Sequence, residues 1–314
     1  MPTAWALPWG AMDTTEKLAA LIERHAQDDG THTTAIGGVT LIRASSPTLP
    51  MPVVYAPTLC LVAQGTKQAT LGTTNYRYDP ANFLVASVDI PVMGSVIEAS
   101  ASRPYLCLQL DLDTAELSEL ALRYPASPGE DGREPAALTL ERTTPALLDA
   151  ATRLLELLDA PQDIDALAPL VLREILYRLL TETGSGVVRR MAQADSHLNQ
   201  ISRAIIWIRR HFREPCRIAD AADSAGMSRS TFHLHFKTIT GMTPLAFRTR
   251  LRMQEAHRLM VSHAADAASA GFQVGYGSPS QFNRDYVRIF GTPPARHGRE
   301  SRHPGQSEEA AAPG

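Results

Sequence analysis

The feature that most constrains this chain is a pattern that occurs twice between residues 217 and 294. In each copy a short helical stretch ends at a glycine, a serine follows, and a second helical stretch ends at another glycine. The copies run through Gly226, Ser228 and Gly241, and through Gly275, Ser278 and Gly291. Each copy predicts a helix, a tight turn and a second helix, an arrangement that places the second helix in the DNA major groove.

The residue types at the turns agree with this geometry. Gly226 and Gly275 stand where a helix must end in a left-handed conformation, which glycine adopts without a steric penalty. Ser228 and Ser278 are expected to cap the helices that follow, and Pro279 stands at the favoured first helical position. We therefore expect a helix to begin directly after each serine.

The second helix of each copy has two chemically different faces. Apolar residues at helical spacing predict buried stripes of Phe232, Phe236 and Ile239, and of Phe282, Tyr286 and Ile289. The opposite faces carry Arg229, Ser230, His233 and Lys237, and Ser280, Asn283, Arg284 and Arg288. Such side chains can bind base edges and phosphates.

These residues carry a resemblance to the AraC/XylS family of bacterial transcription regulators. The resemblance covers Gly226–Gly241, the connecting LRMQEAHRL at 251–259, and 274–294, which reads VGYGSPSQFNRDY and closes with FGTPP. One departure is Gly271, which stands where the first copy has Ala222 and where the family pattern has alanine. A glycine within a helix costs about 1 kcal/mol relative to alanine, so we expect the second copy to be the less rigid one.

The resemblance also implies which residues contact DNA. The implied base-contacting residues are Ser230, His233, Leu234, Pro279, Ser280, Asn283 and Arg284. Arg284 is the strongest of these expectations, because arginine bidentate to guanine is the commonest specific contact. Phosphate candidates are Arg229, Lys237, Arg250, Arg252 and Arg288, although a solvated helix face explains each of them equally well.

Charge divides the chain at the same place. Residues 197–303 hold 16 Lys and Arg against 7 Asp and Glu, whereas residues 1–196 hold 14 against 24. A basic C-terminal third after an acidic remainder is typical of a nucleic-acid-binding domain. The alternative is two domains whose charges differ by chance.

The region from Ala35 to Asp111 alternates with period two and predicts short antiparallel strands in a sandwich or small barrel. The expected strands are Val39–Arg43, Leu59–Gln64, Gln68–Leu71, Asn75–Tyr78, Phe83–Ser87, Met93–Glu98 and Tyr105–Asp111. Residues 50–115 resemble the N-terminal domain of one subgroup of the same family, in which this position usually holds a cupin-like barrel. The fold class is thus α+β and multidomain, with a cupin-like antiparallel β-barrel, flanking helices and an all-α tandem helix-turn-helix domain.

The barrel offers a candidate ligand pocket but no metal site. If the polar-containing strand faces point inward, the pocket is lined by Cys60, Val62, Gln64, Tyr105, Cys107 and Gln109. Alternatively these faces meet solvent or a helix, and the cysteines are small core residues. Residues 33–196 contain no histidine, so the histidine-based metal site of catalytic cupins cannot form, and we expect neither metal nor cofactor.

Helices are expected on both sides of the barrel, at 12–27, 145–158 and 164–183. The apolar faces of the last two suit core packing or, as in the family, a dimer contact. The expected domains are 1–183 for sensing and dimerisation, a linker at 184–196, the DNA-binding domain at 197–303 and a disordered tail at 304–314.

The combined prediction is a cytoplasmic, sequence-specific transcription regulator, an activator, rather than an enzyme. Its expected partners are promoter DNA, RNA polymerase, a small-molecule effector and a second copy in a homodimer. We expect no membrane association, because no stretch approaches 18 apolar residues. Two alternatives remain open: a ligand-independent regulator controlled by a protein partner, and a DNA-repair alkyltransferase with a nucleophilic cysteine.

Overall fold

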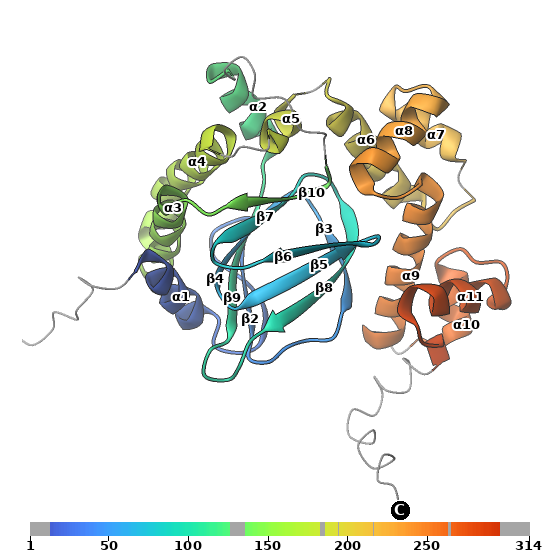
Figure 1. Cartoon of the computed structure of the whole chain (residues 1–314), viewed down its shortest axis with the longest axis horizontal. Helices are drawn as coiled ribbons and strands as arrows, with labels where there is room; N and C mark the ends of the chain where they lie inside the picture. Colours follow the sequence, from blue (N-terminus) through green and yellow to red (C-terminus); the bar gives the residue numbers. More distant parts are fainter. Residues whose placement is uncertain are drawn as a thin grey trace, which may run out of the picture. The chain divides into compact units, whose positions relative to one another are not determined.

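The computed structural model describes residues 13–125, 136–182, 186–193, 195–215, 217–262 and 265–295. The chain divides into two compact units between Asn199 and Gln200. The first unit contains every strand and helices α1–α5 (blue to yellow-green in Figure 1), and the second unit is helical. The predicted tail at 304–314 lies outside the described residues.

Two antiparallel sheets form the centre of the first unit. In hydrogen-bonding order the first sheet holds β1 (Gly30–Thr33), β2 (Val39–Ala44), β9 (Tyr105–Asp111), β4 (Thr58–Gln64), β7 (Asn82–Ala86) and β10 (Leu138–Arg142). The second holds β3 (Met51–Tyr55), β8 (Ile90–Glu98), β5 (Thr66–Leu71) and β6 (Thr74–Tyr78). The sheets enclose a common interior, which gives the predicted cupin-like antiparallel barrel.

The central strands of the first sheet, β9, β4 and β7, are buried on both faces. In β4 every residue from Thr58 to Ala63 is buried, and Leu59 and Leu61 pair across the sheet with Leu110 and Leu108 of β9. This leucine face is covered by α1 (Thr14–His25), which contacts β2, β4 and β9 and buries Leu18, Leu21 and Ile22. The alternate residues of both strands consequently face the barrel interior.

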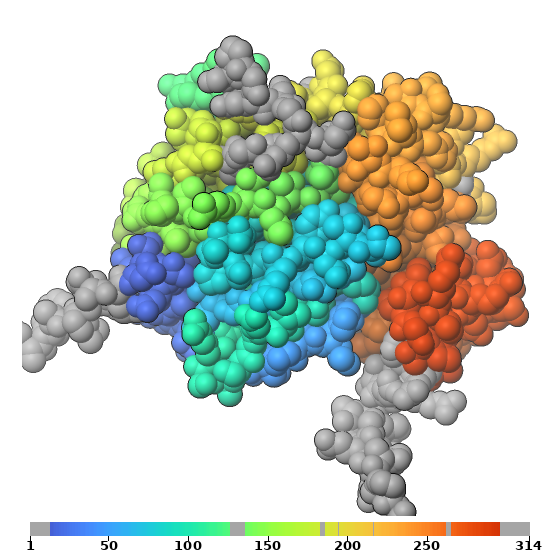
Figure 2. All heavy atoms as spheres, viewed as in Figure 1, coloured from blue at the N-terminus to red at the C-terminus, as the bar shows by residue number. Residues whose placement is uncertain are grey.

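The second sheet has an open outer side. Asn75 and Arg77 of β6 are exposed, and the cyan and green strands form a broad part of the visible surface of this unit (Figure 2). Polar residues therefore alternate with buried ones, the pattern of an antiparallel sheet with one solvated face.

Helices complete the first unit. They are α2 (Thr114–Arg123), α3 (Pro145–Glu156), α4 (Ile164–Glu182) and α5 (Val187–Ala192). Helix α5 lies inside the predicted 184–196 linker, yet it packs on α2 and buries Val187, Val188 and Met191. The apolar residues of this short segment explain the difference, because they give it a face that a solvated linker would not have.

The second unit consists of α6 (His197–His211), α7 (Ile218–Ala225), α8 (Arg229–Thr240), α9 (Pro244–Ser262), α10 (Ala267–Gln273) and α11 (Pro279–Phe290). We call α7 with α8 the first module and α10 with α11 the second module. Helix α9 serves both: Phe247 meets Phe236 at 5.3 Å between ring centroids, while Met253 and Met260 belong to the core around Phe282. One helix therefore supplies core residues to both modules.

Every predicted strand is present, with ends that differ by a few residues, and every predicted helix is found. Strands β1, β3 and β10 and helix α2 were not predicted. The sequence of β1 is polar and mostly exposed, and β3 contains Pro52. Neither strand shows the apolar alternation from which the other strands were inferred.

Candidate nucleic-acid interface and barrel interior

The turn of the first module is held mainly by its own residues, together with a bond from Arg203 of α6 to the Ala225 carbonyl at 3.1 Å. Gly226 ends α7 with φ of 68°, and the Met227 amide donates to the Ala222 carbonyl at 3.1 Å. The Ser228 hydroxyl then accepts from the Thr231 amide at 3.3 Å, which caps α8 as predicted. The buried stripe of α8 is also as predicted.

The second module has a longer turn with a different set of contacts. Gly275 has φ of 88°, as predicted, and the Tyr276 hydroxyl donates to the Asp285 carboxylate at 2.8 Å. Ser278 stands at the N-cap of α11, but its side chain makes no capping bond, contrary to the prediction. Pro279 follows it, and because proline has no amide hydrogen, this end of the helix has one donor fewer to satisfy.

Gly271 has a packing role that the sequence did not reveal. A Cβ atom added there would lie 3.0 Å from the Phe282 ring, closer than ordinary van der Waals contact. The glycine thus lets α10 and the aromatic core of α11 approach closely. The helix-propensity cost of about 1 kcal/mol is offset by this contact, and the lower rigidity of the second module stays a prediction.

The predicted base-contacting residues all lie on exposed faces of their helices. They are Ser230, His233 and Leu234 on α8, and Pro279, Ser280, Asn283 and Arg284 on α11. The side chain of Leu234 is 64% exposed although it is apolar. An exposed leucine among polar side chains suits contact with a thymine methyl group better than packing in the domain.

The predicted phosphate-contacting residues separate into three kinds. Arg229 and Lys237 are exposed on α8, and Arg288 is exposed on α11, where it donates to Asp285 at 2.7 Å. Arg250 is half-buried, and burial lowers the pKa of its guanidinium. The three exposed residues remain predicted phosphate contacts, and Arg250 is less accessible.

Arg252 requires a correction. Its guanidinium donates to the carbonyl of Phe212 at 2.5 Å, of Gly275 at 3.0 Å and of Glu214 at 3.1 Å. It also lies over the Tyr276 ring, 5.5 Å from the centroid. Arg252 therefore joins the segment after α6 to the turn of the second module, because three backbone carbonyls bind the donors that a phosphate would need.

The barrel interior gathers polar groups from both sheets. Cys60 and Cys107 of the first sheet are free and buried, and the Cys107 thiol donates to the Leu108 carbonyl at 3.5 Å. Lys67 of the second sheet lies 5.9 Å from the ring centroids of both Tyr55 and Tyr105. Neither Tyr55 nor Lys67 was predicted to line the interior, because Tyr55 lies on the unpredicted strand β3 and Lys67 lies one residue before the predicted strand Gln68–Leu71.

Burial and mutual contact shift the pKa values in this interior. A hydrogen bond to Cys107 and burial raise the pKa of the Cys60 thiol. Burial alone would raise the pKa of Cys107, but the bond from Cys60 and the charge of Lys67 lower it. Burial alone would lower the pKa of Lys67, but nearby Tyr55 and the two thiols raise it.

The other predicted pocket residues are less available. Val62 is fully buried, and the Gln64 amide donates to the Pro104 carbonyl at 2.7 Å. Gln109 is half-buried and lies opposite Cys60 across the sheet. Cys60, Tyr105 and Cys107 are the predicted residues that the structure brings together.

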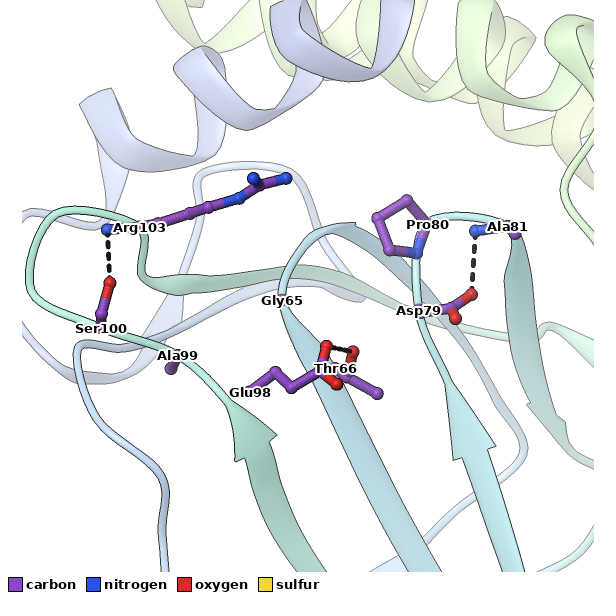
Figure 3. Close-up of a pocket in the computed structure, with 9 residues that line it drawn as sticks. All are labelled: Gly65, Thr66, Asp79, Pro80, Ala81, Glu98, Ala99, Ser100 and Arg103. Atoms are coloured by element: carbon purple, nitrogen blue, oxygen red, sulfur yellow. Dashed lines mark hydrogen bonds between the residues drawn. The ribbon is translucent and has the colours of Figure 1, made fainter.

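A pocket of about 690 Å³ opens at one end of the barrel (Figure 3). It is lined by Gly65, Thr66, Asp79, Pro80, Ala81, Glu98, Ala99, Ser100 and Arg103. The Thr66 hydroxyl donates to Glu98 at 2.6 Å, and Asp79 accepts from the Ala81 amide at 3.0 Å. Both acidic side chains are thus already bonded, while Arg103 extends across the pocket.

The described residues show neither a cluster of metal-binding side chains nor a helix that could span a membrane. In the described part of the chain, no three His, Cys, Asp or Glu side chains converge as they would around a metal ion. Among the helices of the described residues, none has both the length and the apolar character of a bilayer-spanning segment.

Family models match both units of the chain. A model of the AraC-type transcriptional regulator N-terminus matches residues 35–187, and a helix-turn-helix domain model matches residues 221–300. The first match contains the barrel and helices α2–α4, and the second contains both modules.

Similar proteins agree with these matches. An AraC-like protein of Streptomyces lividans is 41% identical over 85 residues, covering 26% of this chain and 28% of that protein. The transcriptional activator RhaS of Escherichia fergusonii is 30% identical over 152 residues, covering 47% of this chain and 52% of RhaS. The chain thus spans about half the length, or less, of these relatives.

A solved structure shares the fold over most of the chain. The crystal structure of ToxT from Vibrio cholerae, with an unsaturated fatty acid bound, has a TM-score of 0.53 and covers 83% of this chain and 93% of its own. The two sequences are 10% identical, so the likeness concerns the fold alone.

Proposed function

Because the chain belongs to the AraC family of transcriptional regulators, we propose that it binds specific promoter sequences in double-stranded DNA and activates transcription. The observation that carries this proposal is the pair of exposed faces on α8 and α11, each backed by a buried aromatic stripe. Polar and cationic side chains on a helix that is rigidly held from behind can enter the major groove.

The length of helix α9 determines how far apart the two modules can contact DNA. It contains 19 residues, which corresponds to about 28 Å at 1.5 Å per residue. Successive major-groove faces are about 34 Å apart. One chain would then read two adjacent groove segments with its two modules, and Arg229, Lys237 and Arg288 would bind flanking phosphates.

Arg284 is the residue expected to contribute most to sequence discrimination. We expect Arg284→Ala to cost about 1–3 kcal/mol of binding free energy and to relax specificity at one base pair. Competition binding with single-base variants of the selected site measures both effects.

Arg288→Ala serves as the matched control, because Arg288 is exposed on the same helix. It should weaken binding to all sequences alike and reduce the salt dependence. If Arg284→Ala also weakens all sequences uniformly, Arg284 binds a phosphate rather than a base.

We also propose that the barrel unit controls DNA binding by α8 and α11. Its polar interior suits a small-molecule effector, which would act by binding one of two DNA-binding states more tightly than the other. We also propose that the regulator acts as a homodimer and contacts RNA polymerase. Leu167 and Leu170 of α4 support the dimer, because these large apolar side chains are 44% and 64% exposed.

A regulator whose barrel only meets a protein partner is the second candidate, and failure of every small molecule to alter DNA binding would favour it. An alkyltransferase is less well supported, because Cys60 and Cys107 are buried and a nucleophile must reach the alkylated base. We accordingly propose that the chain is not an enzyme.

The experiment that tests the proposal is selection of bound fragments from genomic DNA of the source organism, repeated over a range of salt concentrations. Enrichment of one promoter, with affinity that falls steeply as salt rises, is the expected result. The control is a variant with both Arg284→Ala and Asn283→Ala. Equal enrichment by this variant would contradict the proposal. So would the absence of any enrichment by the natural chain, both with and without metabolites extracted from cells.

A further inference from the structure

Lys67 is a cation in an unusual place. Lys67 lies on β5, where it pairs with Tyr78 of β6 and Val96 of β8. It is on the face of the sheet that points into the barrel. Gly94 of β8 lies beside it: a Cβ atom there would lie 3.6 Å from Lys67 Cε and 3.9 Å from Tyr55 Oη, both ordinary contact distances.

This ammonium has no carboxylate partner. Among the described residues neither Asp nor Glu forms an ion pair with Lys67, and the groups that influence its charge are Tyr55, Cys60 and Cys107. Thiols and phenols ordinarily ionise near pH 8.5 and 10, respectively, which is above neutrality, although the charge of Lys67 lowers the pKa of the Cys107 thiol. A largely enclosed cation without a carboxylate partner is costly, which is expected of a site whose counterion arrives with a ligand.

Hydroxyl groups beside Lys67 complete a set of donors. The Tyr105 hydroxyl is buried and has no hydrogen-bond partner among the described residues, and the side chain of Tyr105 has no exposed surface. Tyr55 and Tyr78 share one hydrogen bond of 3.0 Å between their hydroxyls, so one of their two protons is still available. The interior thus offers donors and a positive charge to an acceptor-rich group.

A pocket opens at the end of the barrel where β5 begins. The pocket of about 690 Å³ is lined by Gly65 and Thr66, directly before Lys67 in the chain, and Lys67 itself keeps some exposed surface. This volume lies within the usual range of small-molecule sites, about 300–1,000 Å³. Arg103 at the entrance forms no ion pair within the described residues, so it adds a second positive charge on the path inward.

We propose that the barrel binds a small organic acid, with the Lys67 ammonium as the counterion of its carboxylate and the Tyr105 hydroxyl as a second donor. A carboxylate carries a single negative charge, which one buried cation balances. A phosphate carries about 1.5–2 charges at pH 7 and would be left unbalanced inside the barrel. The proposal names the effector class for the regulator proposed above, and it rests on that function only for the consequence of binding.

Binding is tested with the full chain and without DNA. Thermal unfolding is followed with acetate, hexanoate, benzoate and pyruvate, each compared with its primary amide, which has similar shape and no charge. We expect at least one acid to raise the unfolding midpoint in a saturable way while its amide does not. Equal stabilisation by acid and amide, or no stabilisation by any of the acids, overturns the proposal.

Variants then locate the site. Lys67→Met should weaken acid binding about a hundredfold, because a buried charge pair loses one partner, whereas Lys67→Arg should retain most of it. Arg103→Gln, at the exposed entrance, should change the affinity by about threefold or less. Undiminished binding by Lys67→Met overturns the proposal.

A folding control accompanies these variants. Without ligand, Lys67→Met is expected to unfold at a higher temperature than the natural chain, because an unbalanced buried charge has been removed. If it instead fails to fold, Tyr105→Phe replaces it: this variant keeps the ring and should weaken acid binding about tenfold. Unchanged acid affinity in Tyr105→Phe would then count against the site.

The two proposals can fail separately. If DNA fragments are enriched but no acid binds, the regulator stands and the effector class is wrong. If an acid binds through Lys67 but no DNA is enriched, the site stands and the proposed function is wrong.

Discussion

The two helix-turn-helix modules follow one sequence pattern but are held in place in different ways. In the first module most contacts of the turn are local, through Gly226, the Met227 amide and the Ser228 cap, and one bond comes from Arg203 of α6 to the Ala225 carbonyl at 3.1 Å. In the second module, Gly275 lies against the backbone of Arg213 and its carbonyl accepts from Arg252. The turn of the first module therefore relies mainly on its own residues, whereas the turn of the second depends more on residues far away in the sequence.

This difference shows what a repeated motif does and does not specify. The pattern fixes the helix ends and the buried stripes, because these depend on residues within each copy. It does not fix what surrounds each turn, because that depends on where α6 and α9 pass. The two modules should consequently respond differently to matched changes.

The largest difference is expected for alanine at the two turn glycines. Both have positive φ, which costs a non-glycine residue about 1–2 kcal/mol. At Gly226 an added Cβ has open space, with Arg203 at 4.0 Å, so Gly226→Ala should cost only about 1 kcal/mol. At Gly275 the Cβ would overlap the Arg213 carbonyl, and overpacking brings the total cost of Gly275→Ala to about 3 kcal/mol or more.

Native-state hydrogen exchange of the amides in α8 and α11 measures each cost locally. Gly275→Ala should reduce protection in α11 far more than Gly226→Ala reduces it in α8. Equal losses would show that the turn of the second module does not depend on the segment after α6.

Arg252→Ala is expected to have the next largest effect. It removes three bonds to backbone carbonyls, each from a charged donor, and should destabilise the second module by about 2–3 kcal/mol. Arg258→Ala is the control on the same helix, because Arg258 is exposed and pairs only with Glu255 among the described residues. Exchange in α11 should respond to Arg252→Ala alone, and a similar response to the control would argue against a specific role for Arg252.

The serine caps provide a smaller contrast. Ser228 bonds the Thr231 amide, so Ser228→Ala should cost about 1 kcal/mol. Ser278 makes no capping bond, so Ser278→Ala should be nearly neutral. Thermal unfolding midpoints of the two variants test this, and a loss for Ser278→Ala as large as that for Ser228→Ala would show that Ser278 caps α11 in solution.

The smallest expected difference between the modules is their stability at alkaline pH, which has no effect at neutral pH. Burial raises the pKa of Tyr276, as does its bond to Asp285, and burial raises the pKa of Tyr286. Each folded pKa lies above the unfolded value of about 10, so this stability is complete below about pH 10 and is lost as the pH rises through the folded pKa.

The first module has Phe232 and Phe236 in its stripe, which do not ionise. Limited proteolysis above pH 10 should therefore cleave the second module first, and Tyr286→Phe should reduce the difference. Simultaneous cleavage of both modules would indicate that the tyrosines do not control alkaline unfolding.

The sequence predicted the elements better than it predicted the site. Helix ends at Gly226 and Gly275 followed from local conformational rules, and strands β4 and β9 followed from their alternation. Helix α2 was missed although Asp113 caps it by accepting from the Ala115 amide at 2.8 Å, a signal that the sequence carried.

The role of Arg252 and the neighbourhood of Lys67 could not be found in this way. Arg252 binds carbonyls that lie some 40 positions before it and 23 positions after it in the chain. Lys67 meets Tyr105 only because β5 and β9 belong to sheets that face each other. Periodicity identifies the face on which a residue lies, but it does not identify the partner across the interior.

The double burial of the first sheet has a consequence for synthesis of the chain. Its leucine face is covered by α1, which is made first, but α1 rests on α3 at residues 145–156, and β7 gains its outer neighbour only when β10 at 138–142 emerges. A nascent chain that has reached β9 therefore carries an incompletely covered apolar face. Since non-local pairings form slowly, this interval is when the barrel unit is most exposed to aggregation and most in need of chaperones.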